Sequence, residues 1–223
     1  MTDARQPELF ARMIAESFAP LGWFAPVPQD GLSEDAKSVV LIGNVGPAMF
    51  QRFVRERDPR RDSLDDWTRE TVDRLTRALG AGAIYPFDAP AHPFLRWGQR
   101  AGAGQGSPLG LNIHPVFGLW HAYRAALLFP TVLELPTPVD AAHPCDTCVD
   151  KPCLTGCPVS AFDGVGYNVA GCVQHLSREA GHACLSGGCL ARRACPVGRE
   201  FAYMPRQAQF HTRAFFRSQG GKG

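Results

Sequence analysis

Apolar positions in residues 1–136 fall into two patterns, unbroken apolar runs and amphipathic stretches. The run Ser38–Asn44 predicts a buried strand, and Ala83–Phe87 predicts a second one. Gly46 and Pro47 follow the first run. Proline suits the first position of a helix, and the apolar pattern predicts that this helix runs through Phe53 or beyond. Strands that alternate with helices in this way predict an α/β (α+β) domain.

Two stretches have the periodicity of amphipathic helices. One lies near the N-terminus and places five apolar residues on one face, namely Leu9, Phe10, Met13, Ile14 and Phe18. The other starts after Ser63, whose hydroxyl can cap the helix, and ends at Gly80. Its core face would carry Leu64, Trp67, Thr71, Leu75 and Leu79.

Glycine and proline divide the rest of the chain. Residues 98–110 hold five glycines, and residues 111–129 predict two strands around a turn at His114–Gly118. The closely spaced Pro136 and Pro138 end regular structure and indicate a linker. We therefore expect an α/β domain over residues 1–136, a small cysteine-rich domain over residues 137–200, and a tail over residues 201–223.

Composition and charge exclude several classes of protein. The 223 residues are 45% hydrophobic, enough to bury a core, and the formal net charge is only +2. No basic stripe stands out, so nucleic acid is not an expected partner. The N-terminal stretch lacks the regions of a signal peptide, and no apolar run approaches the about 20 residues that span a bilayer. We expect a cytoplasmic protein without a membrane partner.

The cysteines say more about chemistry than any other feature. None occurs before residue 145, whereas a secreted disulfide scaffold would spread its bridges through the fold. This clustering favours a metal site. The first half of the region reads C-x2-C-x4-C-x3-C-P and the second reads C-x11-C-x4-C-x5-C-P. The eight residues are Cys145, Cys148, Cys153, Cys157, Cys172, Cys184, Cys189 and Cys195.

Each half ends in Cys-Pro, as in two-cluster bacterial ferredoxins, where the last cysteine of a run binds the other cluster. Eight thiolates match two [4Fe–4S] clusters in number. Because the gaps are wider than in ferredoxins, two other interpretations stay open. They are a pair of four-cysteine zinc sites and a set of disulfides, which fit the expected compartment poorly. Three nearby histidines are expected to pack or to hydrogen-bond: His143, His175 and His182.

The order of the cysteines resembles that of epoxyqueuosine reductase, a cobalamin-dependent iron–sulfur enzyme. That family has a ferredoxin-like run, a lone cysteine, and three more that end in Cys-Pro. The resemblance implies two ligand sets. One cluster would take Cys145, Cys148, Cys153 and Cys195, and the other would take Cys157, Cys172, Cys184 and Cys189.

The residues before the cysteines resemble cobalamin-processing chaperones of the CblC type. Pro47–Phe50 (PAMF) matches a helix start of that family, and Ile113–Trp120 (IHPVFGLW) matches its turn. Both families bind a corrinoid on a domain that is similar to flavin reductases, so a flavin is not excluded. The resemblance implies a corrinoid close to four residues, His114, Gly102, Gly104 and Gly118, although His114 could equally brace the turn.

The implied activity is that of an oxidoreductase that passes electrons from the two clusters to a bound corrinoid. Its electron donor would be a ferredoxin or a flavoprotein. Asp88 stands where the reductase has its proton donor and is the candidate catalytic residue. Its alternative role is to cap the turn before Pro90. An electron-transfer or cobalamin-handling module without substrate chemistry, and a zinc-binding structural protein, are the other hypotheses.

Two departures from the reductase family bear on the substrate. The sequence ends soon after its cysteines, before the helical-repeat extension that serves tRNA binding in many reductases. Gly104–Pro108 also replaces a reductase motif. Both departures argue against a tRNA substrate, in agreement with the charge pattern.

Overall fold

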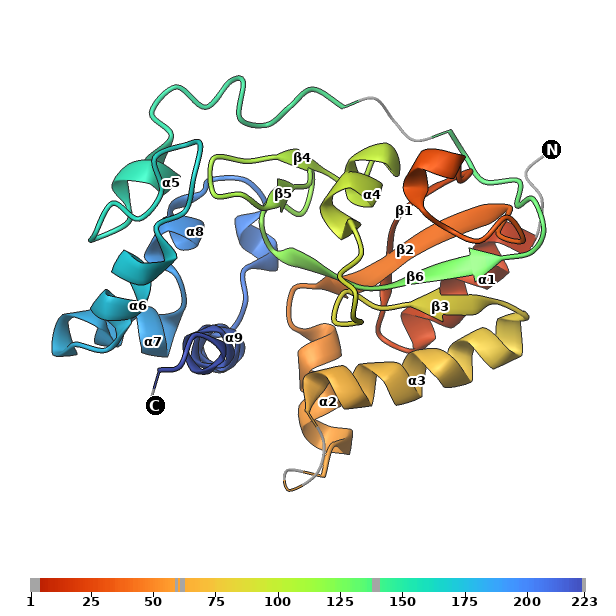
Figure 1. Cartoon of the computed structure of the whole chain (residues 1–223), viewed down its shortest axis with the longest axis horizontal. Coiled ribbons are helices and arrows are strands. Elements are labelled where there is room, and N and C mark those ends of the chain that lie inside the picture. The colour runs from red at the N-terminus through yellow and green to blue at the C-terminus, as the bar shows by residue number, and fades with distance from the viewer. Residues whose placement is uncertain (1–4, 59, 61–62, 138–140, 222–223) are drawn as a thin grey trace. The chain divides into compact units, whose positions relative to one another are not determined.

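The chain divides into two compact units. A computed structural model describes residues 5–58, 60, 63–137 and 141–221 (Figure 1). One unit, here the sheet unit, comprises Met1–Gln105 with His121–Asp140. The other, the cysteine unit, comprises Gly106–Trp120 with Ala141–Gly223. The cysteine unit therefore includes the turn at residues 114–118 as well as all eight cysteines. The domain bounds expected from the sequence stay a prediction, and Pro138 lies outside the described residues.

A four-stranded antiparallel sheet forms the centre of the sheet unit, with the strand order β1-β2-β6-β3. The strands are β1 (Ala19–Phe24), β2 (Ser38–Val45), β6 (His121–Phe129) and β3 (Gly82–Ile84). β2 is buried at every residue except the last. Because successive side chains of a strand point to opposite faces, both faces of the sheet must be covered at β2.

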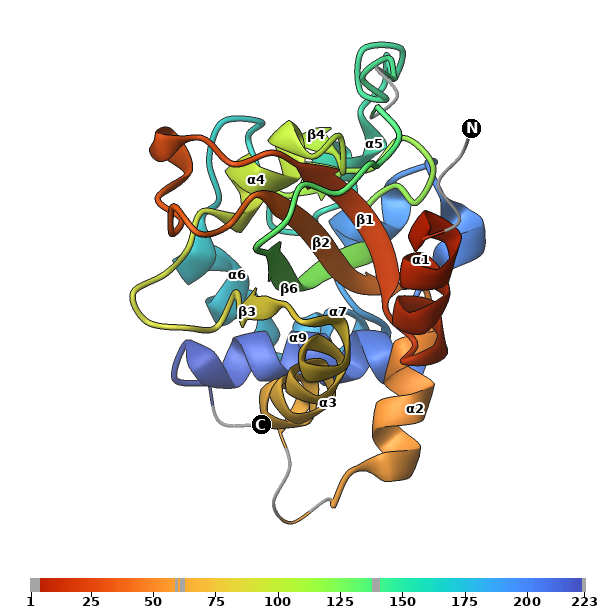
Figure 2. The ribbon, with the colours of Figure 1, turned by 90° about the vertical axis from the view of Figure 1, so that its right-hand side faces the viewer.

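Helices cover those faces. α2 (Ala48–Glu56) and α3 (Leu64–Leu79) lie on one side of the sheet and α4 (Phe94–Arg100) lies on the other (Figure 1, Figure 2). α1 (Arg5–Ala15) packs beside β1, and a 3-10 helix, η1, spans Pro28–Asp30. The core of this unit lies between the sheet and these helices.

Most elements expected in this unit are confirmed, and so is the mixed α/β class. Ser63 caps α3, its Oγ accepting the Asp66 N–H at 3.1 Å, and Gly80 ends the helix at φ 64°. Two details are wrong. Ile14 is 61% exposed and does not share the buried face of α1. The strand expected at residues 83–87 ends at Ile84, because the chain turns there.

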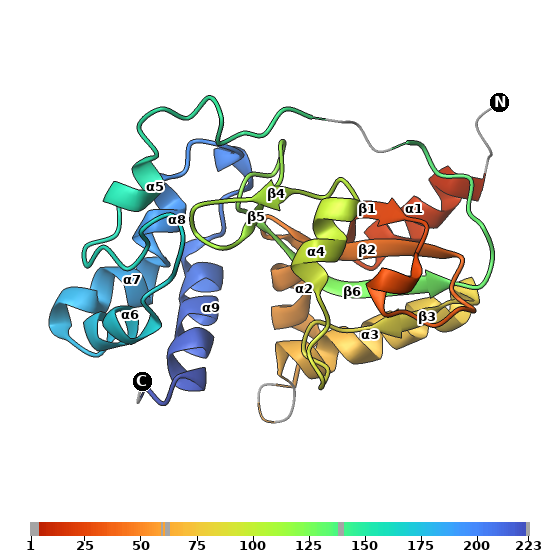
Figure 3. The same cartoon turned by 45° about the horizontal axis from the view of Figure 1, so that its top comes forward.

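The cysteine unit is built mainly of short helices (Figure 3). β4 (Gln105–Gly106) pairs with β5 (Asn112–Ile113). The helices that follow are α5 (Pro152–Thr155), α6 (Val169–Leu176), η2 (Glu179–Gly181), α7 (His182–Gly187), α8 (Leu190–Ala194), η3 (Arg199–Phe201) and α9 (Pro205–Ser218). α9 packs along α7. Within the described ranges, no helix combines the length and apolar character needed to cross a bilayer.

Candidate metal centre

Four thiols line a small cavity in the cysteine unit. Its volume is about 20 Å³, and its lining includes Cys145, Cys148, Cys153 and Cys195. The first two lie on the loop before α5, the third lies in the first turn of α5, and the fourth follows α8. We call these residues the first cysteine set. Three of its members come from the first half of the cysteine region and one from the second.

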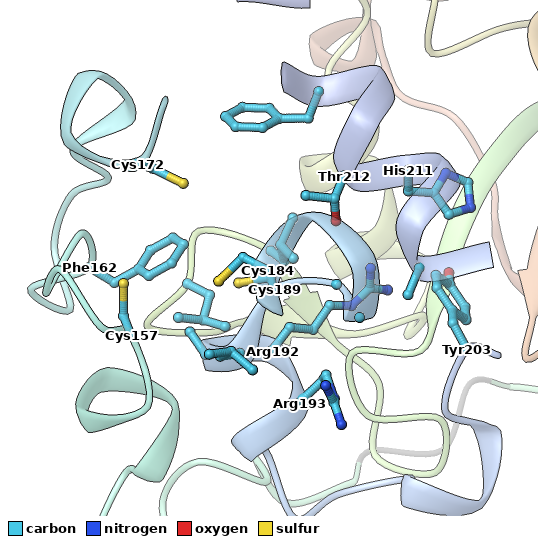
Figure 4. A pocket seen from close by; sticks show the side chains of 18 of the residues that line it. Cys157, Phe162, Cys172, Cys184, Cys189, Arg192, Arg193, Tyr203, His211 and Thr212 are labelled. Carbon is cyan, nitrogen blue, oxygen red and sulfur yellow. The ribbon is translucent and has the colours of Figure 1, made fainter. Parts of the chain in front are cut away.

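The other four thiols line a second, much larger cavity of about 980 Å³ (Figure 4). They form the second cysteine set, Cys157, Cys172, Cys184 and Cys189. Cys172 lies on α6, Cys184 lies on α7, and Cys189 precedes α8. The structure therefore brings together the two groups of four that the family resemblance implied.

The thiols within each set interact electrostatically. Burial raises the pKa of Cys145, and its three partners in the first set raise it further. Burial also raises the pKa of Cys184, and Cys172 and Cys157 of the second set add to the rise. Every such coupling between described thiols runs within one set. These couplings group the thiols in the same way as the two cavities do, and binding a metal at either set would require the loss of these protons.

Backbone N–H groups point at the sulfur atoms of both sets. The Ala161 N–H donates to Cys157 Sγ at 3.3 Å. The N–H groups of Leu190 and Val197 hydrogen-bond to Cys184 and Cys195 respectively. These donors belong to the turns after each cysteine and to the start of α8, where helical N–H groups have no partner within the helix. Hydrogen bonds to sulfur are one of the levers that set the potential of an iron–sulfur cluster.

The spacing of the ligands bears on what they could hold. All eight cysteines are described, and none is paired in a disulfide. Among the described side chains, no three His, Cys, Asp or Glu groups gather closely enough to hold one metal ion. A four-iron cube places iron and sulfide between its thiolates. It therefore needs more widely spread ligands than a single zinc ion with Zn–S bonds of about 2.3 Å.

The turn at residues 114–118 is held by its own backbone and by His114. The Nδ1 atom of His114 accepts the N–H groups of Val116 and Phe117 at 3.0 and 3.1 Å. Burial lowers the pKa of His114 to about 4, so this acceptor is neutral at pH 7. Gly118 has φ 55°, and a Cβ there would run into the Val197 carbonyl. Both residues thus shape a turn that packs on the segment after Cys195.

The other candidate residues, Asp88, Gly102 and Gly104, belong to the sheet unit. Asp88 accepts a hydrogen bond from Arg69 at 2.5 Å and one from the Tyr85 N–H at 3.0 Å. These bonds form the turn that ends β3, as the capping alternative predicts. Gly102 and Gly104 have φ of 67° and 148°, conformations open to glycine. Gly102 is exposed and Gly104 is buried.

Sequence reasoning missed most of the residues that surround the second cysteine set. Arg192, Tyr203 and His211 line the larger cavity with it, and so does Trp120, an aromatic residue that the sequence offered for a cofactor pocket but favoured as ordinary core. They come from three separate segments, and no spacing rule joins them. His175 also lines this cavity, whereas His143 hydrogen-bonds to the Gly106 carbonyl at 2.9 Å through Nε2.

Taken together, the two units define an α/β protein that carries a separate eight-cysteine unit. No family model and no curated protein matches the chain. Solved structures of epoxyqueuosine reductase do match its fold. The enzyme of Streptococcus thermophilus is 15% identical, with a TM-score of 0.58, over 91% of this chain and 70% of the reductase. The enzyme of Bacillus subtilis, solved with a catalytic loop swung out of the active site, is also 15% identical, with a TM-score of 0.54 over 90% and 67%.

A third structure corrects one expectation. An epoxyqueuosine reductase solved with an epoxyqueuosine-modified tRNA stem loop is 17% identical, with a TM-score of 0.55 over 92% of this chain and 70% of that one. The sequence argument against nucleic acid as a partner is therefore wrong for proteins of this fold. A basic stripe along the sequence is not required, because a binding surface is assembled by the fold from scattered residues. The resemblance to the reductase is confirmed for the fold, and that to the CblC type stays a prediction.

Proposed function

We propose that the chain is an iron–sulfur oxidoreductase whose cysteine unit holds two [4Fe–4S] clusters. One observation carries this proposal. Two cavities are each lined by four thiols, and the two halves of the region exchange Cys157 and Cys195 between them. This exchange is what the Cys-Pro runs of two-cluster ferredoxins entail. The fold likeness to epoxyqueuosine reductase supports it.

The surrounding residues fit such clusters. Clusters of this kind transfer single electrons, at potentials set by hydrogen bonds to sulfur and by exposure to solvent. Backbone N–H groups stabilise the added negative charge of the reduced form. Around the second set, Phe162 stacks on Tyr167 at 4.5 Å between ring centroids, and the Tyr167 hydroxyl hydrogen-bonds to Cys172. Both side chains line the cavity together with the second set.

A corrinoid is the electron acceptor we propose, on the strength of the helix-start motif at residues 47–50. A corrinoid supplies a cobalt ion that takes up electrons one at a time. His114 and Gly118 do not fit as its contacts, because they are committed to the turn and to the backbone at Val197. Gly102, with its exposed backbone, is the contact that fits. No proton-transfer step is assigned to Asp88.

A nucleic-acid substrate is the second part of the proposal. The observation that favours it is the reductase of the same fold that holds a tRNA stem loop. The chain would then reduce a modified nucleoside within RNA. Retention of a modified stem loop by the cluster-loaded protein, with an unmodified stem loop as control, tests this part separately.

Anaerobic purification with metal analysis tests the central claim. We expect about eight irons and eight acid-labile sulfides per chain, from two cubes of four, and a brown protein. Stoichiometric zinc, or intramolecular disulfides in place of sulfide, would contradict the proposal. A cobalamin titration of the same material, followed by the change in cobalamin absorbance, tests the acceptor without bearing on the clusters.

A further inference from the structure

The larger cavity extends well beyond the second cysteine set. At about 980 Å³ it lies at the upper end of the range, about 300–1,000 Å³, of pockets that hold small molecules. The four cysteines lie toward one end, Tyr203 and His211 lie at the other, and Arg192 lies between them (Figure 4). A cube bound to the cysteines would fill only their end. The remaining space has its own walls, all from the cysteine unit.

The wall formed by Arg192, Trp120 and Tyr203 is rigid. Arg192 donates from both Nε, at 2.9 Å, and Nη2 to the Leu119 carbonyl. Its guanidinium lies 4.5 Å from the ring centroid of Tyr203 and 5.1 Å from that of Trp120. The two rings meet edge to face at 5.6 Å. Side chains fixed in this way form a preorganised wall, which lowers the cost of ordering them when a ligand binds.

The cavity is also cationic. Its lining contains three arginines, Arg192, Arg193 and Arg199, and among the described lining residues there is no Asp or Glu. Most of the remaining lining is apolar or aromatic. Such a surface favours a ligand that combines an apolar ring with a negative group.

Two deeply buried polar atoms point to a ligand with hydrogen-bonding groups. Trp120 is 4% exposed and His175 is 8% exposed, and both line the cavity. Within the described part of the chain, neither Trp120 Nε1 nor His175 Nε2 has a hydrogen-bond partner. Leaving such a group without a hydrogen-bond partner destabilises the protein. A ligand that pairs with these atoms would remove that destabilisation.

We infer that this end of the cavity binds a planar anion of nucleotide size, with its phosphate or carboxylate at the arginines. The inference deepens the proposed function, because the site adjoins the second cluster. The chemistry fits a free nucleotide and a nucleotide within RNA equally.

Equilibrium binding to the cluster-loaded full chain tests the inference. We expect FMN to bind saturably, and riboflavin, which has the same ring without the phosphate, to bind at least tenfold more weakly. A short single-stranded RNA that displaces FMN would identify the source as RNA, and failure to displace it would identify a free nucleotide. The inference is overturned if FMN does not bind saturably or if riboflavin binds as tightly.

Two variants place the site. Trp120→Phe keeps the ring and removes Nε1–H, so FMN binding should weaken about three- to tenfold, the effect of one hydrogen bond. Arg193→Gln should weaken FMN binding but not riboflavin binding. Arg213→Gln is the matched control, because Arg213 is exposed on α9 outside the cavity lining, and it should leave both unchanged. Equal effects of the two arginine variants would place the ligand elsewhere.

Iron and sulfide content is measured in every sample. A wild-type protein without clusters means that the proposed function has failed. An iron-replete protein that binds no planar anion means that only the present inference has failed.

Discussion

Asp88 carries a negative charge that its surroundings stabilise. Burial alone raises the pKa of this carboxyl, but the hydrogen bonds from Arg69 and from the Tyr85 N–H outweigh burial and lower it. A carboxyl with a depressed pKa is ionised at pH 7 and cannot donate a proton there. The ring of Tyr85 lies beneath the Arg69 guanidinium, 4.3 Å from it, and helps to hold the pair. The geometry around Asp88 therefore favours a structural role for this residue.

Replacing the charge tests that role. Asp88→Asn should lower the free energy of unfolding by about 0.5–1 kcal/mol at pH 7, the value of a partly exposed ion pair. Because the folded-state pKa is the lower one, this contribution is complete above the unfolded value of about 3.9 and is lost as the pH falls through the folded pKa. Urea unfolding between pH 7 and pH 3 measures the difference.

Asp35→Asn is the control, since Asp35 is exposed and makes no ion pair in the described chain. It should change stability by less than about 0.5 kcal/mol. The catalytic hypothesis would be restored if Asp88→Asn left stability unchanged at pH 7 and abolished substrate reduction by the loaded protein.

Gly118 shows how a single missing Cβ positions a cysteine. Gly118→Ala would force a methyl group into the Val197 carbonyl at φ 55°. We expect a loss of at least about 2 kcal/mol, from overpacking and backbone strain together. Displacement of the segment after Cys195 should also lower the iron content. Gly110→Ala is the control, because Gly110 has φ 70° with no atom within 4 Å of the added methyl, and should cost only about 1 kcal/mol.

At the scale of elements, the sequence predicted what local chemistry determines. The cap at Ser63 and the end at Gly80 define α3 because each uses only its own neighbours along the chain. The strand expected through residue 87 stops at Ile84. The reason is that the N–H of Tyr85 donates a hydrogen bond to the Asp88 carboxylate and not to a carbonyl of a neighbouring strand. A side chain three residues away overrode the apolar pattern there.

The α3 cap gives a quantitative test of that reasoning. Ser63→Ala removes the acceptor for the Asp66 N–H and should destabilise the sheet unit by about 1 kcal/mol, within a range of about 0.5–2. Ser63→Thr keeps the hydroxyl and should restore most of the loss. Thermal and urea unfolding of the three proteins decide the matter. Equal stability of the alanine variant and the wild type would contradict the assigned cap.

At the scale of the whole molecule, the sequence showed how many cysteines there are but not how they group. Counting alone allowed zinc sites, disulfides or clusters, and the two sets came from a family resemblance. The sequence could not predict that the wall formed by Arg192, Trp120 and Tyr203 faces the second cysteine set. Trp120 precedes the cysteines, Arg192 lies among them and His211 follows them, so only folding brings these residues together.

The grouping of the cysteines can be tested by paired substitutions. If Cys157 and Cys184 hold the same cube, the double variant Cys157→Ser/Cys184→Ser should lose four irons and keep about four. Cys157→Ser/Cys195→Ser should lose both cubes, because its members belong to different sets. If each half of the sequence held its own cube, both double variants would lose both.

Cys153→Ser/Cys195→Ser repeats the comparison for the first set and should also keep about four irons. Iron and sulfide analysis of anaerobically reconstituted protein gives the counts. Far-ultraviolet circular dichroism shows whether each variant is folded, so that a missing cube is not confused with a missing fold. Either of these two pairs decides the grouping, because each joins cysteines of one set that lie in different halves of the cysteine region.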